Sequence, residues 1–147
     1  MGQLLAIAIK HQKRGAMQLL QRAQVTTTAG VENDFRGKPG ERQVTVLTDK
    51  GWRAACKEIA EELPWPTRRA NLYIGGLDLY ASTGLQLHIG SLRLLITRET
   101  DPCHRMQEAH PGLFQALTKD WRGGVCCQVI QNGAIAVGDT VSIVDAS

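Results

Sequence analysis

The residues with the clearest capacity for chemistry lie in TDPCHRM, residues 100–106, directly after an apolar run. Its Thr-Asp-Pro start suits the beginning of a helix, with Thr or Asp as the cap and Pro at the first helical position, so Cys103 should fall in the first turn. The positive end of a helix and the nearby Arg98 and Arg105 favour a thiolate, whereas the Asp101 carboxylate opposes it. Two interpretations stay open from these residues: Cys103 is a reactive thiol, or it is buried at a strand–helix junction.

The other three cysteines differ in their surroundings. Cys56 shares an apolar helical face with Trp52, which indicates a core position. Cys126 and Cys127 are adjacent, so on a strand their side chains point to opposite faces and cannot easily bind one zinc ion. One of this pair must face away from the core. We therefore expect Cys103 to be the most reactive thiol, Cys56 to be inert, and the adjacent pair to be intermediate.

Two other motifs do not predict a site. GVENDFRGK, residues 30–38, resembles a phosphate-binding P-loop, but six residues separate its glycines and Pro39 stands where Ser or Thr is needed. His88 lies in an alternating strand pattern that directs it to solvent. The sequence does not place His11, His88 or His110 beside Cys103, so no cysteine–histidine pair is assigned.

Strand-like runs separated by turn signals dominate the chain. They predict strands over residues 3–9, 23–27, 42–48, 68–80, 85–90 and 92–97, followed by a C-terminal meander that begins with a hairpin at Asn132-Gly133. One strong apolar stripe predicts a helix over residues 49–63, ended by Pro64. The long loop over residues 29–42 is expected to be functional. Because no βαβ alternation is present, we expect a mainly β fold, a single antiparallel barrel with two or three short helices filling residues 1–147.

Composition narrows the class of protein. The chain has 147 residues and a formal net charge of +3, a mild excess that suits an anionic ligand but lacks the strongly basic face of a nucleic-acid-binding protein. No apolar run approaches the roughly 20 residues of a membrane helix, and no signal peptide is apparent. We therefore expect a soluble cytoplasmic protein with reduced thiols, with no nucleic acid or membrane as a partner.

Several segments, in their order along the chain, resemble the MOSC domain family, the molybdenum cofactor sulfurase C-terminal domains. They are GERQVTVL, RANLYIGGLDL, GLQLHIGSLRLLIT, DPCHRM and WRGGVCCQVIQNGAIAVGDTVSIV, and they cover nearly the whole chain. The resemblance implies a barrel-like, mainly β domain. It also implies that Cys103, the cysteine of the x-P-C motif, ligates molybdenum.

The same resemblance implies which residues hold the pterin of the molybdenum cofactor. Arg69 and Asn71 match the R-x-N motif that contacts the polar and phosphate groups of the pterin, and Arg42, with Gln43 beside it, matches the polar start of the upstream strand. The cofactor-binding set that we predict is Arg42, Arg69, Asn71, Arg98 and Arg122. The chain departs from the family at ENDFRG, residues 32–37, where Gly-Asp and a following His are usual.

Three functions are compatible with these residues. In the first, Cys103 ligates molybdenum and the arginines hold the pterin phosphate. In the second, Cys103 carries a persulfide from a cysteine desulfurase to a metal–sulfur cluster or cofactor. The third is a non-catalytic barrel that binds an anion or a protein. Since no flavin, iron–sulfur or pyridoxal-phosphate domain is recognisable, an enzyme of this kind would be a component of a molybdenum-dependent oxidoreductase or a sulfur transferase, served by a partner protein that donates electrons or sulfur.

Arg69 and Asn71 lie two positions apart, so in a strand both would face one side of the sheet. An arginine on that side is costly to bury unless it is paired or meets an anion. We therefore expect both residues to line one cavity with Cys103. In the alternative, Arg69 pairs with a carboxylate such as Asp78 and only stabilises the fold.

Overall fold

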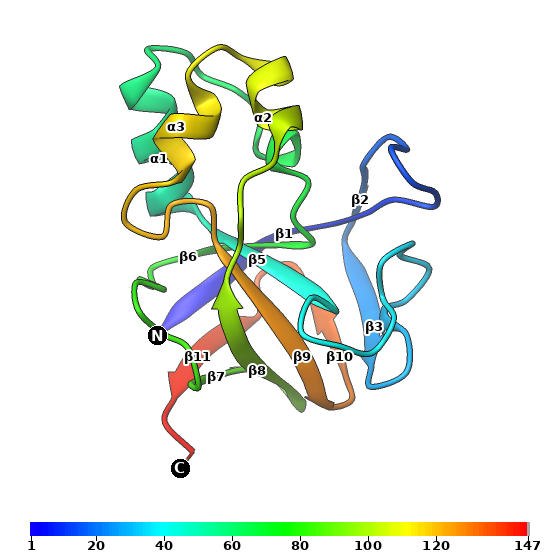
Figure 1. Cartoon of the computed structure of the whole chain (residues 1–147). Coiled ribbons are helices and arrows are strands. Elements are labelled where there is room, and N and C mark those ends of the chain that lie inside the picture. The colour runs from blue at the N-terminus through cyan, green and yellow to red at the C-terminus, as the bar shows by residue number, and fades with distance from the viewer. Residues whose placement is uncertain (147) are drawn as a thin grey trace.

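The computed structural model describes residues 1–146, and strands dominate them (Figure 1). The strands are β1 (Gly2–Ile9), β2 (Gln18–Leu20), β3 (Arg22–Thr26), β4 (Gly30–Val31), β5 (Val44–Thr48), β6 (Leu72–Gly75), β7 (Gln86–Ile89), β8 (Leu92–Glu99), β9 (Val125–Gln131), β10 (Gly133–Ala136) and β11 (Thr140–Val144). The helices are α1 (Asp49–Glu58), α2 (His104–Ala109), α3 (Leu113–Leu117) and the 3₁₀ helix η1 (Trp65–Arg68).

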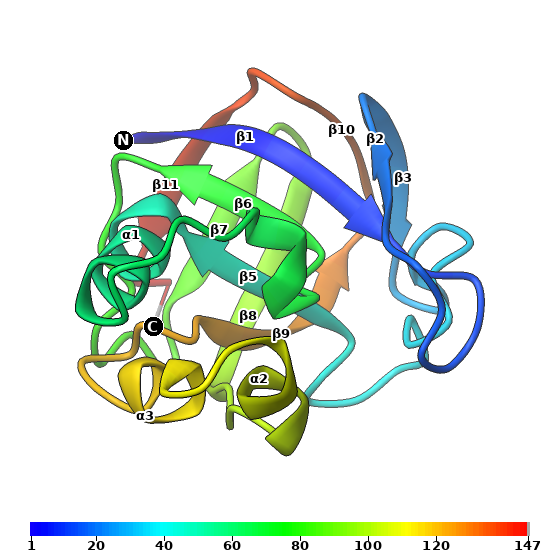
Figure 2. The ribbon, with the colours of Figure 1, turned by 90° about the horizontal axis from the view of Figure 1, so that it is seen from above.

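Seven strands close into a barrel. Their order is β11-β7-β8-β9-β5-β6-β1, and β1 pairs again with β11, which Figure 2 shows from above. β2 extends the barrel sheet beyond β1, while β10, β3 and β4 form a second, smaller sheet. The mainly β barrel with short helices is therefore confirmed, and closure leaves few unpaired strand edges.

The barrel is mixed, so the expectation of a purely antiparallel barrel is wrong. β5 and β6 run parallel, with Val46 opposite Leu72 and Thr48 opposite Ile74. Parallel neighbours need a crossover of a dozen or more residues, usually with a helix. Here the segment of α1 and η1 provides that crossover, and it brings η1 to the end of the barrel.

The helix predicted over residues 49–63 ends earlier, at Glu58. Thr48 caps its start, since the Thr48 hydroxyl accepts a hydrogen bond from the Gly51 amide. After the helix, Ala60 adopts a left-handed conformation with φ 55° and reverses the chain. Leu63 nevertheless packs against the apolar cluster that contains Trp52 and Cys56, and the Leu63 carbonyl accepts a hydrogen bond from Trp52 Nε1. A turn, and not a longer helix, therefore places Leu63 on the apolar side that its spacing in the sequence predicted.

The predicted C-terminal meander is also wrong. β10 pairs with β3, and β11 pairs with β1 and β7, so Asn132-Gly133 does not fold β10 back onto β9. Asn132 instead accepts a hydrogen bond on its Oδ1 from the Thr27 amide. A Cβ at Gly133 would lie 2.4 Å from the Leu92 amide nitrogen. Glycine is therefore needed at this position for close packing, and not for a two-residue hairpin.

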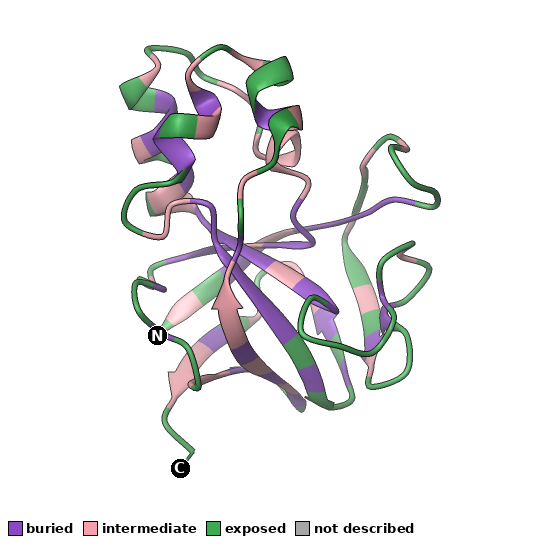
Figure 3. Cartoon of the chain, in the orientation of Figure 1, coloured by how far each residue is buried: buried purple, intermediate pink, exposed green. Residues whose placement is uncertain are grey.

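Two apolar clusters hold the elements together. The first fills the barrel with the inward residues of its strands, such as Leu92, Leu94 and Ile96 of β8. The second packs the three α-helices against the outer side of β5 and includes Leu47, Trp52 and Cys56. Figures 1 and 3 show the helices gathered at one end of the barrel, with buried faces turned toward it. None of the described helices is long and apolar enough to cross a membrane.

Candidate functional site

A cavity of about 110 Å³ opens where η1 and α2 meet the barrel. It is bounded by the end of β1, the β4–β5 loop, the β8–α2 connection and the turn before β9. Its wall is formed by Lys10, Met17, Asp34, Arg36, Arg42, Thr45, Arg68, Arg69, Ala70, Asn71, Thr100, Cys103, Arg105, Met106 and Gly123. We call this cavity the basic pocket.

The structure brings four of the predicted site residues to the basic pocket: Arg42, Arg69, Asn71 and Cys103. Arg69, Asn71 and Cys103 thus share one cavity, as the sequence led us to expect, while what they bind there stays a prediction. Arg98 and Arg122 do not line this cavity. The long loop before β5 does contribute to it, through residues 34–42.

Positive charge dominates the wall of the basic pocket. Its six cationic side chains are Lys10, Arg36, Arg42, Arg68, Arg69 and Arg105, against the single carboxylate of Asp34. Within residues 1–146, no Asp or Glu lies within 4.0 Å of any of the six as an ion-pair partner. Asp34 is occupied by backbone amides, those of Lys10 and Arg36. Concentrated, unpaired cations in a concave site attract anions.

Arg68 is fixed by neutral groups. Its Nε donates to the Gly123 carbonyl at 3.1 Å and one terminal nitrogen donates to Thr100 Oγ1 at 2.7 Å. Burial lowers the pKa of the Arg68 guanidinium, while the Cys103 and Cys126 thiolates would raise it. The guanidinium stays ionised in proteins, so its charge is held at the pocket wall without a carboxylate to balance it.

Arg69 occupies an uncommon backbone position, and the strand expected over residues 68–80 does not include it. Arg69 is the C-cap of η1 in the left-handed region, with φ 67°, and β6 begins only at Leu72. One terminal nitrogen of Arg69 donates to the Gly15 carbonyl, but its Nε is buried and has no partner. The alternative pairing with Asp78 is wrong, because Asp78 pairs with Lys50 at 2.9 Å. A buried donor without a partner is costly and suits a ligand oxygen.

Lys10 closes the basic pocket at the end of β1 and is 9% exposed. Burial, together with the charges of Arg69, Arg36 and Arg105, lowers the pKa of Lys10 to about 8, while Asp34 opposes this shift. Lys10 is therefore a cation near neutral pH that is poised to lose its proton in mildly alkaline solution. A bound anion would favour the charged form.

Anion binding is therefore expected to weaken as pH rises through about 8, where Lys10 loses its charge. Sulfate is the suitable probe, because its own charge is constant on both sides of that pH. Titration calorimetry should show falling affinity with pH and proton uptake on binding. The Lys10→Met protein should bind more weakly and show neither effect, and an unchanged pH profile in that variant would exclude Lys10 as the group responsible.

Stability should change in the opposite direction over the same range. The folded-state pKa of Lys10, about 8, lies below the ordinary 10.5 of the unfolded chain. The native state thus holds fewer protons between these values, and the contribution of Lys10 to the free energy of unfolding rises with pH there. Burial of the charged Lys10 side chain lowers the free energy of unfolding by its full amount below pH 8. This loss of stability disappears as pH rises toward 10.5.

Asn71 organises the wall and has little hydrogen-bonding capacity left for a ligand. Its Oδ1 accepts from the Thr45 amide at 3.1 Å, and its Nδ2 donates to the Ala8 carbonyl at 3.2 Å. The side chain therefore ties β1, β5 and the start of β6 together behind the pocket. The role of Asn71 in the structure is positional.

Gln43 also has a structural position. It is 1% exposed, its Nε2 donates to the carbonyls of Thr27 and Gly37, and its Oε1 accepts from the Val129 amide. These three bonds hold the β4–β5 loop together and connect it to the turn between β3 and β4 and to β9. Arg42, by contrast, is exposed and lines the pocket, and its charge acts to lower the pKa of the Cys126 thiol.

Cys103 lies one residue before the first turn, as the N-cap of α2, so its predicted position within that turn is wrong. Its side chain makes no capping hydrogen bond to the helix. Neither Thr100 nor Asp101 is the cap. The Thr100 hydroxyl instead donates to the Gly123 carbonyl at 2.7 Å. Cys103 is exposed at the pocket, so the interpretation of a cysteine buried at the junction is excluded.

The remaining cysteines are buried. Cys56 belongs to the helical apolar cluster, as predicted. Cys127 faces the barrel core, whereas Cys126 points to the other face but is fully covered. Burial raises the pKa of both adjacent thiols, and Arg98, Arg42 and Arg68 only partly oppose this for Cys126.

Alkylation of the folded protein should therefore modify Cys103 first and leave the other three thiols protected. The structure changes the expectation for Cys126 and Cys127 from intermediate to slow, since both have no exposed surface. Mass mapping after brief treatment with iodoacetamide checks this order. Modification of Cys126 at the rate of Cys103 would show that the residues covering Cys126 move aside readily.

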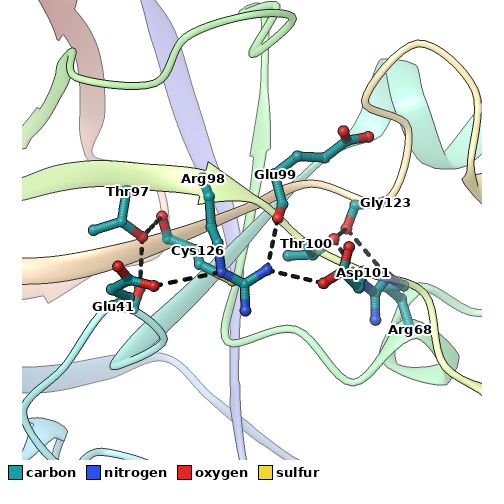
Figure 4. A network of polar contacts seen from close by, with 9 residues as sticks. All are labelled: Glu41, Arg68, Thr97, Arg98, Glu99, Thr100, Asp101, Gly123 and Cys126. Carbon is teal, nitrogen blue, oxygen red and sulfur yellow. Dashed lines mark hydrogen bonds and ion pairs between the residues drawn. The ribbon is translucent and has the colours of Figure 1, made fainter.

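Arg98 does not line the basic pocket, and a bulge in β8 determines which face of the barrel wall it occupies. Ile96 pairs with Cys127 and Arg98 with Cys126, which makes Thr97 the extra residue and shifts Arg98 off the inward face. Arg98 lies between Glu41 and Asp101 (Figure 4); its guanidinium nitrogens are 3.7 Å from a Glu41 carboxylate oxygen and 3.2 Å from an Asp101 carboxylate oxygen. Arg98 therefore connects the two loops that carry Arg42 and Cys103, and its predicted place among the pocket residues is not observed.

Arg122 pairs with Glu58 at 2.8 Å and also donates to the Ala116 carbonyl. Together with the pair between Lys119 and Glu58 at 2.9 Å, this contact joins α1 to the segment after α3. The guanidinium has a carboxylate partner and lines another depression, of about 330 Å³, whose wall includes Tyr80. Arg122 is thus a structural cation and not part of the basic pocket.

Sequence reasoning missed Lys10, Arg36 and Arg68. Arg68 directly precedes Arg69, and Lys10 directly follows the apolar run of β1, so each stood beside a recognised feature. Arg36 lies in the long loop that was expected to be functional, at the point where the chain departs from the family pattern. A charged residue at the end of a buried strand was the available signal for Lys10.

Protein side chains alone do not form a metal site here. Among the described residues, no three His, Cys, Asp or Glu side chains are close enough to hold a metal ion. A metal at Cys103 would therefore need its other ligands from a cofactor. The basic pocket holds an exposed thiol, a ligand type that suits soft metals, and arginines, a side-chain type that suits phosphate.

Comparison with known proteins gives a consistent result. The model of the MOSC domain family matches residues 15–142. No curated protein matches the chain. Among solved structures, YuaD from Bacillus subtilis is similar with a TM-score of 0.81 at 19% identity, covering 97% of this chain and 96% of that one.

Two structures of YiiM are also similar. The protein from Geobacillus stearothermophilus gives a TM-score of 0.79 at 15% identity, over 98% of this chain and 75% of that one. The protein from Escherichia coli gives 0.74 at 15% identity, over 99% and 71%. At these identities the three structures establish a shared fold.

Proposed function

Because this chain belongs to the MOSC domain family, we propose that its basic pocket binds the phosphate-bearing pterin of the molybdenum cofactor, with Cys103 as the thiol that meets the metal. The observation that carries this proposal is the sharing of one cavity by six cations, a single carboxylate and an exposed thiol. Phosphate oxygens would satisfy the unpartnered Arg69 Nε and balance Arg68. The donor set therefore fits the cofactor.

The residues have separate tasks in this proposal. Arg68, Arg69 and Lys10 hold the phosphate at the closed end, where burial strengthens charge-assisted hydrogen bonds. Arg42 and Cys103 lie at the exposed side. A cofactor bound there supplies atom-transfer and electron-transfer chemistry at its metal, and the protein supplies orientation and electrostatics.

The cavity limits how much of such a cofactor the chain encloses. At about 110 Å³ it is well below the roughly 300 Å³ of typical small-molecule pockets, so it accommodates a phosphate and leaves most of a pterin outside. A partner protein would then cover the rest. This arrangement suits a domain that receives, holds or delivers a cofactor.

Purification from cells with active cofactor synthesis tests the proposal. Wild-type protein should retain molybdenum and pterin, measured by metal analysis and by fluorescence of the oxidised pterin. The double variant Arg36→Ala, Arg42→Ala should lose both, and Cys103→Ser should lose the metal and keep the pterin. Arg53→Ala, which removes an exposed arginine of α1, should match wild type. A folded wild-type protein that retains no pterin would refute the proposal.

A second function is favoured by one observation, the exposure of Cys103 beside three buried thiols. In sulfur relay, the Cys103 thiolate attacks the terminal sulfur of a persulfide on a donor protein such as a cysteine desulfurase. The sulfur–sulfur bond of the donor breaks, its thiolate leaves, and Cys103 becomes the persulfide without net oxidation. The nearby Arg68 and Arg69 would stabilise the persulfide anion.

A further inference from the structure

We propose that the basic pocket also admits a small dianionic donor of sulfane sulfur, of the thiosulfate class, so that Cys103 can be loaded with sulfur without a donor protein. This inference rests on the sulfur-relay function and names a substrate class for it. Three properties of the pocket support it: its size, its charge and the sulfur atoms on its wall.

Size favours a compact tetrahedral anion. The cavity of about 110 Å³ is too small to enclose a drug-sized heterocycle, for which roughly 300 Å³ is the lower bound. Thiosulfate consists of one sulfonate-like group and one outer sulfur. It can therefore enter a space that holds a single phosphate-sized group and still place its outer sulfur near the wall.

Charge favours a dianion, and the half-buried Arg68 and Arg69 determine which end enters. Arg69 Nε is buried without a partner, and Arg68 carries a charge that only neutral oxygens contact. Sulfonate oxygens supply the acceptors that both guanidinium groups lack. An uncharged sulfur donor offers no such acceptors and gains nothing from this part of the pocket.

The wall beside Cys103 suits sulfur. Met17 and Met106 line the same cavity as Cys103, and Met106 is 1% exposed. Thioether sulfur is polarisable and packs favourably against soft, weakly hydrated groups. The outer sulfur of thiosulfate is such a group, so the pocket offers cations for one end of the donor and a soft surface for the other.

The reaction is balanced without an oxidant. The Cys103 thiolate attacks the outer sulfur of thiosulfate, a new sulfur–sulfur bond forms, and the original one breaks with its electron pair leaving on sulfite. Two anions approach each other in this step, and the leaving group carries two charges. The cations of Arg36, Arg42 and Arg105 reduce the repulsion between the two anions and stabilise the charge of the leaving sulfite, as preorganised charge does at a reacting centre. Lys10 Nζ holds a proton at the pocket near neutral pH.

The purified full chain, incubated with thiosulfate, provides the test. Wild type should release sulfite and gain the mass of one sulfur atom on the Cys103 peptide in equal amounts. The double variant Arg36→Ala, Arg42→Ala removes two exposed cations. Its rate of sulfur loading should be about one tenth of the wild-type rate or lower, since one charged hydrogen bond is worth that factor. Its Cys103 should still react normally with uncharged iodoacetamide, and Arg53→Ala should load as wild type does.

A neutral organic trisulfide separates this inference from the function on which it rests. Loading by the trisulfide but not by thiosulfate would overturn the thiosulfate inference and leave sulfur relay intact. Failure of both donors, with an alkylatable Cys103, would overturn the two together. Loading by thiosulfate at equal rates in wild type and the double variant would also overturn the inference, because the pocket would then play no part.

Discussion

The Gln43→Ala protein is expected to unfold with a free energy about 3 kcal/mol below that of wild type, at roughly 1 kcal/mol for each of three lost hydrogen bonds. Gln43 is 1% exposed and bonds to Thr27, Gly37 and Val129. Its removal takes one partner from the half-buried bond to the Thr27 carbonyl and leaves the buried Gly37 carbonyl and Val129 amide without this contact. Urea unfolding measures the change, with Gln128→Ala, an exposed glutamine on β9, as the matched control.

The Gln43→Glu protein makes the same test reversible. A carboxylate can still accept from the Val129 amide, but it repels the two carbonyls unless it is protonated. The folded state would therefore raise the pKa of this carboxyl, so its contribution to stability is present at low pH and lost as pH rises. If Gln43→Ala proves as stable as Gln128→Ala, the loop is held by other contacts.

Loss of the Arg69 side chain is expected to weaken sulfate binding by about tenfold or more, the worth of one charge-assisted hydrogen bond of about 1.5–3 kcal/mol. Two variants separate binding from strain. Arg69 has φ 67°, a conformation that costs about 1–2 kcal/mol in residues other than glycine. Both Arg69→Ala and Arg69→Gly should lose affinity, but Arg69→Gly should be the more stable of the two.

Calorimetric titration with sulfate and urea unfolding give the two quantities for each variant. Arg53→Ala on α1 is the control for loss of an exposed arginine. Wild-type affinity in both Arg69 variants would mean that Arg69 serves only to hold the Gly15 carbonyl over the pocket. Equal stability of the alanine and glycine variants would show that the left-handed backbone is relaxed there.

Local pattern was sufficient for much of the fold. The alternation of Leu87 and Ile89 with polar neighbours predicted a half-buried strand, and the buried positions agree. Cys56 was placed in the core from its helical spacing to Trp52, and both side chains lie in one apolar cluster. These features depend on residues within one or two turns of each other, so their sequence carries the information.

Long-range pairing was beyond reach of that reasoning. β5 pairs with β6 in parallel, and β10 pairs with β3. The alternation of apolar residues in these segments is compatible with many other partners and registers. The helix over residues 49–63 failed for a related reason, since a turn at Ala60 keeps Leu63 in the same apolar cluster. Burial decides such cases, and burial depends on the whole chain.

The sequence by itself placed a cysteine flanked by arginines beside a helix start, and the family resemblance led us to expect Arg69 and Asn71 with it, although the strand proposed to carry both residues begins only at Leu72. Only the tertiary structure decided which cations join them. A one-residue bulge at Thr97 turns Arg98 toward the outer face of the barrel. Arg122 forms an ion pair with Glu58, a residue far away in the sequence, and so does not line the pocket. Lys10, Arg36 and Arg68 enter instead, because barrel closure brings the end of β1, a long loop and η1 to one cavity. The type of a side chain is local, but the charges that surround it are set by the strands that meet there.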